Sequence, residues 1–114
     1  MKIIVLKFGG TSVGTLSKIT KVAKVIASYA KKKYKVIVVS SAMSGVTNQL
    51  LLKTKKISQN FPNEEKDVIL STGEQISCAL IAGKLNLLGY KSRSWLGWQL
   101  PIITKGKHLS LIHI

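Results

Sequence analysis

The chain has 114 residues, of which 46% are hydrophobic, and a formal net charge of +14. This is enough apolar material for one domain with a core, although the length is small for a complete enzyme. No apolar run reaches 18 residues, so we expect no membrane span and a cytoplasmic protein. The single cysteine, Cys78, excludes an internal disulfide and is expected to be a buried structural thiol.

The positive charge comes from 18 lysine and arginine residues against only 4 acidic ones. Such a balance is compatible with binding to nucleic acid or to an anionic membrane. The lysines, however, are scattered over predicted helix faces and are not interleaved with aromatic side chains that could stack on bases. We therefore expect no nucleic-acid and no membrane partner, while a basic anion- or nucleic-acid-binding module without catalysis remains the alternative outside enzymes.

The first part of the chain alternates between strand and helix patterns. Residues 3–8 are a continuous apolar run rich in β-branched residues, which predicts a fully buried strand of a parallel sheet. Thr11 and Ser12 are expected to cap a helix over residues 13–29, where apolar residues recur at steps of three and four.

A second unit of the same kind follows. Residues 36–39 predict another buried strand, and residues 46–57 predict a helix. Alternation of this kind indicates an α/β fold with a mainly parallel sheet, right-handed crossovers and helices on its faces.

Helical patterns continue into the last third of the chain. Residues 64–70 predict a helix, residues 71–74 an interruption and residues 75–88 its resumption, with Gly89 closing it. Residues 92–95 and 100–104 are candidate short strands.

The first segment that could carry chemistry is Lys7 to Ser12, directly after the first strand. Adjacent glycines, Gly9 and Gly10, let the backbone approach a phosphate closely and direct N–H groups at it. The positive end of the following helix points to the same place, and Lys7 could neutralise charge on a transferring phosphoryl group. The alternative is an ordinary glycine turn with a solvent-facing lysine. The pattern is not that of a P-loop.

The second segment, residues 40–48, follows the second strand and is rich in hydroxyl groups. Because the carboxyl ends of parallel strands meet at one edge, this segment is expected beside the first. Hydroxyls can hydrogen-bond a carboxylate or a phosphate. The alternative is that Ser44 or Thr47 merely caps the next helix.

The third segment, residues 71–75, places Glu74 in an apolar helical region. A carboxylate there is costly to bury without a partner, and it could recognise the ammonium group of an amino acid. The alternative is a solvated glutamate at a helix kink.

Taken together and in order, the three segments resemble aspartate kinase, a member of the amino-acid kinase superfamily. The resemblance rests on Lys-Phe-Gly-Gly-Thr-Ser-Val at 7–13, Val-Ser-Ser-Ala-Met at 39–43 with Thr-Asn at 47–48, and Thr-Gly-Glu at 72–74. It also takes in residues 95–104, so that it covers roughly residues 2–105. It implies the three-layer α/β/α sandwich of that superfamily, here incomplete.

The resemblance also implies an activity, which is transfer of the γ-phosphoryl group of ATP to the side-chain carboxylate of L-aspartate. This reaction opens lysine, threonine and methionine biosynthesis, with ATP and Mg²⁺ required and no metal ligand assigned to the chain. Lys7 would be catalytic and would contact the phosphates. The expected ATP- and phosphate-binding residues are Lys7, Phe8, Gly9, Gly10, Ser12 and Ser41. The expected aspartate-binding residues are Ser41, Thr47 and Glu74.

Members of the family are several hundred residues long, so the resemblance makes residues 1–107 the N-terminal part of a kinase domain. Residues 108–114 are expected to be an atypical tail. We expect the isolated chain to have little activity and the full-length parent to be a homo-oligomer. Another amino-acid kinase, such as an acetylglutamate or glutamate kinase, remains an alternative.

Overall fold

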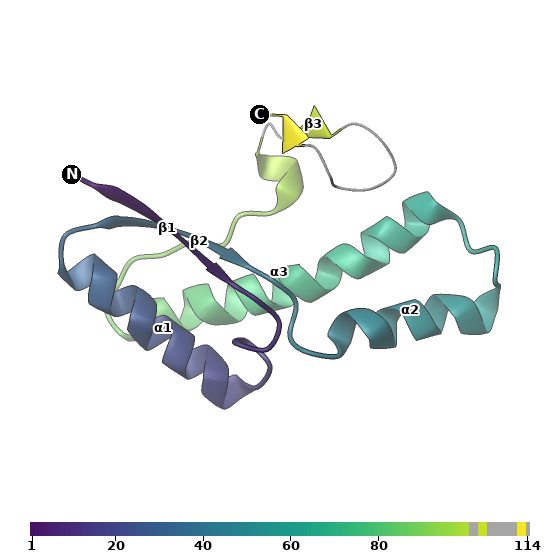
Figure 1. Ribbon diagram of the computed structural model, residues 1–114, viewed down its shortest axis with the longest axis horizontal. Coiled ribbons are helices and arrows are strands. Elements are labelled where there is room, and N and C mark those ends of the chain that lie inside the picture. The colour runs from purple at the N-terminus through teal and green to yellow at the C-terminus, as the bar shows by residue number, and fades with distance from the viewer. Residues whose placement is uncertain (101–102, 105–111, 114) are drawn as a thin grey trace.

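The computed structural model describes residues 1–100, 103–104 and 112–113. Its elements are β1 (Ile3–Phe8), α1 (Leu16–Lys31), β2 (Lys35–Ser40), α2 (Val46–Ile57), α3 (Asn63–Leu87), η1 (Gly97–Gln99), β3 (Ile103–Thr104) and β4 (Ile112–His113). Helices α1 and α3 lie along the two long strands, while α2 extends beyond their ends (Figure 1).

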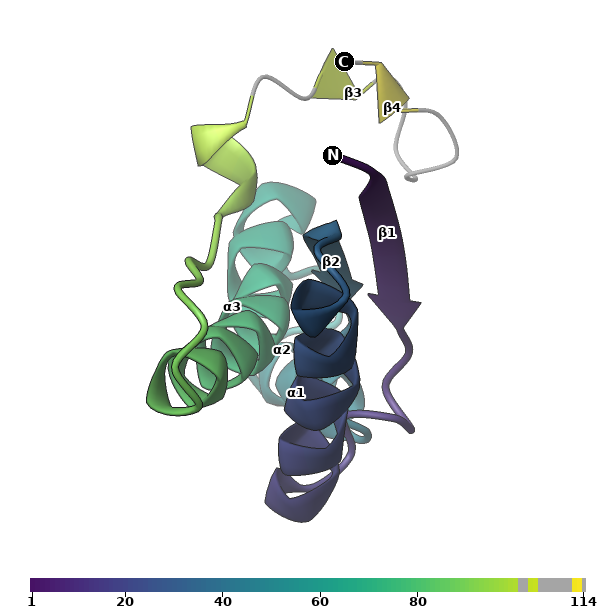
Figure 2. The same ribbon diagram turned by 90° about the vertical axis from the view of Figure 1, so that its left-hand side faces the viewer.

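Strands β1 and β2 are parallel and pair in register from Ile3 with Lys35 to Phe8 with Ser40. The predicted α/β class with a parallel sheet is therefore confirmed. The prediction that both strands are fully buried is wrong, because exposed and partly buried residues alternate along each strand. Only one face of the sheet is covered, so this part of the chain forms two of the three layers expected (Figure 2).

The core lies between the covered sheet face, α1 and α3. Its buried residues on the two helices include Ile19, Val22, Ala23, Ile26, Ile81 and Leu85, and Leu6, Val36 and Val38 of the strands pack against them. Apolar residues at helical spacing thus form the inward stripe of α1, as its pattern predicted.

Helix α1 begins later than expected. Thr15 is its N-cap, and the Thr15 side chain accepts a hydrogen bond of 3.2 Å from the backbone N–H of Lys18. The prediction that Thr11 and Ser12 cap the helix is wrong, because residues 9–14 are used in turns of their own.

Helix α3 is continuous over 25 residues, so the predicted interruption at residues 71–74 is wrong. Gly73 is buried within this helix. A Cβ on Gly73 would lie 2.9 Å from the Cβ of Ala42 and 3.3 Å from Cγ1 of Val46. The glycine therefore serves the close approach of α3 to the segment after β2, and it does not end the helix.

The chain turns at Gly89, as predicted, with the N–H of Tyr90 bonded to the carbonyl of Leu85 at 2.9 Å. Residues 92–95 do not form the predicted strand. Ser92 is held on α3 instead, through its N–H to Oδ1 of Asn86 at 3.1 Å and its hydroxyl to the carbonyl of Ala82 at 2.8 Å.

The predicted strand at residues 100–104 is present as the short β3, which pairs with β4 in antiparallel fashion. Residues 101–102 of that prediction, and the expected boundary at residue 107, lie outside the described residues. Within the part of the chain that is described, no helix has the length and apolarity needed to cross a membrane.

Candidate functional site

The ends of β1 and β2 meet at one edge of the sheet. Phe8 pairs with Ser40, and the N–H of Ser41 donates to the carbonyl of Phe8 at 3.0 Å, one residue beyond β2. The loop of residues 9–15 and the loop of residues 41–45 therefore leave the sheet side by side (Figure 1). This confirms that the first two predicted segments share a sheet edge.

The first loop is folded by its own backbone hydrogen bonds. The N–H groups of Ser12 and Val13 both donate to the carbonyl of Gly9, at 3.1 and 3.3 Å, and that of Gly14 donates to Thr11 at 3.3 Å. The N–H groups of Gly9, Gly10 and Thr11 donate to no acceptor among the described residues. These three amides are the ones that an anion at this loop could engage.

The two loops are in direct contact. A Cβ on Gly10 would lie 3.2 Å from the carbonyl oxygen of Ala42, which is tighter than nine in ten real Cβ contacts. Gly10 therefore allows the first loop to pack against the second. This packing requires glycine at position 10 whether or not a ligand binds. Close approach of the backbone to a phosphate would require it as well, because both need the absence of a side chain.

Helix α3 closes the site from a third side. The hydroxyl of Ser77, which is fully buried, donates to the carbonyl of Ser41 at 2.7 Å and to the carbonyl of Glu74 at 3.1 Å. Our sequence analysis missed Ser77. Its signal is a small polar residue within the apolar stripe of α3, one turn after Glu74.

The second loop does not act as a side-chain cap. The residue that precedes α2 is Gly45, and no side chain caps the helix by hydrogen bonding. The alternative role of Ser44 or Thr47 as a helix cap is therefore wrong. Thr47 lies in the first turn of α2 and is partly buried.

Lys7 and Glu74 are both exposed. Lys7 lies next to Val39 on the uncovered face of the sheet, at the last position but one of β1. Glu74 lies on α3 one turn before Cys78. Helix α3 runs through Glu74 without a break, and the exposure of this side chain agrees with the solvated glutamate of the alternative.

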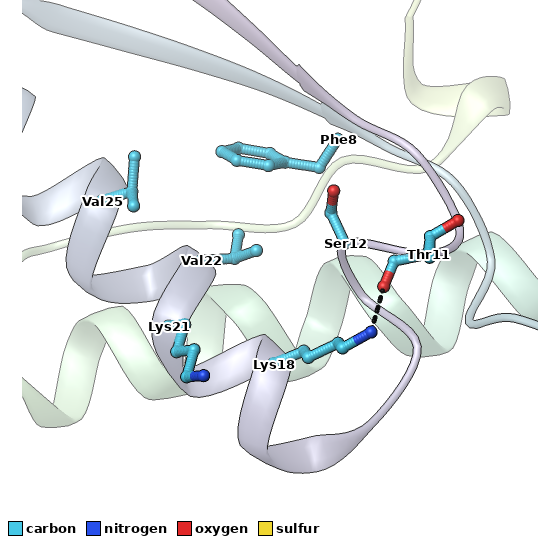
Figure 3. Close-up of a pocket in the computed structure, with 7 residues that line it drawn as sticks. All are labelled: Phe8, Thr11, Ser12, Lys18, Lys21, Val22 and Val25. Carbon is cyan, nitrogen blue, oxygen red and sulfur yellow. Dashed lines mark hydrogen bonds between the residues drawn. The ribbon is translucent and has the colours of Figure 1, made fainter.

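Phe8 and Ser12 line an open cavity of about 430 Å³ between the first loop and α1 (Figure 3). Two cationic side chains, Lys18 and Lys21, line it as well. The ammonium group of Lys18 donates to the carbonyl of Thr11 at 3.2 Å and ties the loop to the helix. Four other predicted residues are not among those that line this cavity: Lys7, Ser41, Thr47 and Glu74. The cavity therefore does not bring all the predicted site residues together.

Cys78 is half-buried, not fully buried as predicted. Burial is the main cause that raises the pKa of its thiol above the usual 9.0, and the charge of Glu74 adds to it. A hydrogen bond from the backbone N–H of Ser40 acts in the opposite direction. Cys78 therefore contacts the backbone of Ser40, the last residue of β2.

The described residues contain no group of three or more histidine, cysteine, aspartate or glutamate side chains placed to hold a metal ion. The donor set at this sheet edge consists of backbone amides, hydroxyls and single charged groups. Such a set suits an anionic ligand or an amino acid.

The sequence matches the Amino acid kinase family over residues 2–109. It is 46% identical over 108 residues to the aspartokinase of Geobacillus stearothermophilus, covering 95% of this chain and 26% of that protein. It is 44% identical over 111 residues to the aspartokinase of Rickettsia felis, covering 95% and 28%. The chain thus spans about a quarter of the length of the relatives it matches.

Solved structures agree. The aspartate kinase of Synechocystis superposes with a TM-score of 0.74 at 42% identity, over 77% of this chain and 15% of that one. Aspartokinase III of E. coli, in complex with aspartate and ADP, superposes with a TM-score of 0.61 over 78% of this chain and 30% of that one. At 21% identity this second likeness supports the fold alone. The family match covers nearly the whole chain, so the chain belongs to the amino acid kinase family.

Proposed function

We propose that this chain forms the part of an aspartate kinase that binds the phosphates of ATP and the substrate aspartate. In the reaction, an oxygen of the aspartate side-chain carboxylate attacks the γ-phosphorus of ATP. The bond from that phosphorus to the bridging oxygen breaks, and the products are 4-phospho-L-aspartate and ADP. Catalysis of this kind depends on positioning and on charge stabilisation more than on a reactive protein group.

The observation that carries the proposal is the meeting of two loops at the ends of neighbouring parallel strands, fixed by the 3.0 Å hydrogen bond from Ser41 to Phe8. Ligands of open α/β sheets bind at such an edge. Aspartokinases of Geobacillus stearothermophilus and Rickettsia felis match this chain at more than 40% identity, and the Synechocystis aspartate kinase shares its fold at 42% identity.

On the ATP side, Lys7 is proposed to neutralise charge on the transferring phosphoryl group. The phosphates would be bound by the backbone of Phe8, Gly9 and Gly10. The hydroxyl groups of Ser12 and Ser41 would donate further hydrogen bonds to them. Mg²⁺ is proposed to enter the site bound to the phosphates of ATP.

On the aspartate side, Ser41 and Thr47 are proposed to hold the substrate carboxylates, and Glu74 its ammonium group. Support comes from the exposure of Glu74 one turn before Ser77, which is bonded to the carbonyl of Ser41. We further propose that the protein acts in the cytoplasm, in the biosynthesis of lysine, threonine and methionine, and that the complete enzyme is a homo-oligomer.

The experiment that tests the substrate is a titration of the ¹⁵N-labelled chain, followed by NMR, with L-aspartate, L-glutamate and N-acetyl-L-glutamate, each in the presence of MgADP. We expect shifts at Ser41, Thr47 and Glu74 that are largest with aspartate. Glu74→Gln should abolish them, while the control Glu65→Gln, also exposed on α3, should not. Stronger shifts with N-acetylglutamate, which has no ammonium group, would contradict the role of Glu74 and favour another amino-acid kinase.

A further inference from the structure

The hydroxyl of Ser77 joins the backbones of two residues that are proposed to bind aspartate. It donates to the carbonyl of Ser41 at 2.7 Å and to the carbonyl of Glu74 at 3.1 Å. Ser41 stands on the carboxylate side of the proposed aspartate site, and Glu74 stands on its ammonium side. Ser77 itself has no exposed surface, so it connects the two sides from beneath the site without contacting a ligand there.

The backbone of Ser41 is held at both of its polar groups. Its carbonyl also accepts a hydrogen bond of 3.0 Å from the hydroxyl of Ser40, so the two lone pairs of the oxygen are both used. Its N–H donates to the carbonyl of Phe8 at 3.0 Å. Of these three bonds, the one from Ser77 fixes Ser41 relative to α3 and therefore relative to Glu74.

A second contact sets the distance between α3 and the segment after β2, one turn before Ser77. A Cβ on Gly73 would lie 2.9 Å from the Cβ of Ala42, a distance that real Cβ atoms essentially never show, and 3.3 Å from Cγ1 of Val46. Ala42 directly follows Ser41, and Val46 directly precedes Thr47. A side chain at position 73 would therefore push the carboxylate-binding segment away from α3.

The distance between α3 and this segment bears on the length of the amino acid that the site accepts. Aspartate and glutamate carry the same charged groups and differ by one methylene group, which adds about 1.5 Å of chain. Such a difference changes binding to an enzyme pocket by about 10- to 200-fold. A site that discriminates between the two needs its ammonium-binding and carboxylate-binding groups at a fixed separation.

We propose that Ser77 and Gly73 are positioning residues that adapt the site to aspartate and against glutamate. Ser77 holds the segment after β2 against α3, and Gly73 permits the close approach. Both residues are buried and act through Ser41, Thr47 and Glu74. The inference rests on the proposed function, because it takes from it the groups that bind the two ends of the substrate.

The test is binding of L-aspartate and of L-glutamate to the ¹⁵N-labelled chain in the presence of MgADP, for the wild type, Ser77→Ala and Gly73→Ala. The readout is the ratio of the two dissociation constants. We expect the wild type to favour aspartate by about 10-fold or more, and each variant to reduce this preference by about fivefold or more, chiefly by weakening aspartate. A purely structural defect would weaken both ligands alike and leave the ratio unchanged.

Two control variants on the same helix match these substitutions. The exposed hydroxyl of Ser71 bonds only within α3, and a Cβ on Gly83 meets nothing within 4 Å. Ser71→Ala and Gly83→Ala should therefore keep the ratio within about twofold. Ser77→Cys, which retains a weak donor at the same position, should restore part of the preference. A ratio that falls equally in the controls would overturn the inference.

A measurement without ligand separates this inference from the proposed function. In the free chain, Ser77→Ala should speed hydrogen exchange at the amide of Ser41 by about fivefold, because the segment is less firmly held. Unchanged exchange there, or an unchanged ratio in Ser77→Ala, would overturn the positioning role and leave the proposed function standing. If Gly73→Ala does not fold, Ser77→Ala decides alone. A wild-type chain that binds neither amino acid would contradict the proposed function, and this inference with it.

Discussion

The hydroxyl of Ser77 donates a hydrogen bond of 2.7 Å to the carbonyl of Ser41, across 36 positions of sequence. It joins the middle of α3 to the first residue after β2. Since the N–H of Ser41 is bonded to Phe8, one residue connects the helix, the second loop and the end of β1. The position of Ser41 at the candidate site is thus set by its two backbone groups.

Ser77→Ala should lower the free energy of unfolding by about 1 kcal/mol, because the Ser41 carbonyl keeps only the bond from the Ser40 hydroxyl. Urea unfolding followed by circular dichroism measures this. Ser28→Ala is the control, since the exposed hydroxyl of Ser28 bonds only within its own helix, and its effect should stay within about 0.5 kcal/mol. Equal effects of the two variants would show that the hydrogen bond from Ser77 to Ser41 does not contribute to the free energy of unfolding.

Gly73→Ala and Gly83→Ala should act in opposite directions although both glycines lie in α3. A Cβ on Gly83 meets nothing within 4 Å, so alanine there should stabilise by about 0.5–1 kcal/mol. A Cβ on Gly73 would lie 2.9 Å from that of Ala42, so alanine there should destabilise by about 1–3 kcal/mol. Thermal unfolding of the pair checks this, and stabilisation by Gly73→Ala would refute the close contact.

Thr15→Ala should lower the stability by about 1 kcal/mol, because the N–H of Lys18 loses its capping acceptor. Thr11→Ala should change it by less than about 0.5 kcal/mol, since the Thr11 side chain makes no hydrogen bond within the described residues. Helix content and urea midpoints of both variants measure the difference. A larger effect at Thr11 would restore the cap that the sequence suggested.

The Cys78 thiol should ionise at higher pH than a free cysteine, because burial raises its pKa above the usual 9.0 and Glu74 adds to the effect. The pH profile of alkylation by iodoacetamide measures this, and Glu74→Gln should move the profile to lower pH. An acid whose pKa is raised by folding favours its neutral form in the folded state. Stability should therefore fall as the pH rises through the pKa of the unfolded thiol, and Cys78→Ala should remove that part of the loss. A profile at or below that of free cysteine would contradict the burial.

Much of the fold followed from local patterns. The apolar runs at residues 3–8 and 36–39 and the helical spacing between them predicted β1, α1 and β2, because burial of one continuous stripe decides each element. The parallel pairing followed from the alternation. Local patterns could not predict which face of each strand is buried, because this depends on which other elements cover the sheet.

Errors in prediction arose where tertiary contacts override local signals. Gly73 reads as a helix break in sequence, and its real role is a contact with Ala42 on another segment. Residues 92–95 have strand character, yet hydrogen bonds from Ser92 to Asn86 and Ala82 hold them on α3. Ser77 was missed because its only local signal is a small polar residue in an apolar stripe, which does not reveal the hydrogen bond to Ser41, 36 positions away.

The loop from Gly9 to Ser12 is proposed to bind the phosphates of ATP. The most direct measurement is a titration of the ¹⁵N-labelled chain with MgATP, followed through its amide resonances. We predict the largest shifts at Gly9, Gly10 and Thr11, with loss of binding in Lys7→Met and retention in the surface control Lys24→Met. Shifts confined to the lysine-rich segment 31–35, with Lys7→Met unchanged, would contradict the account.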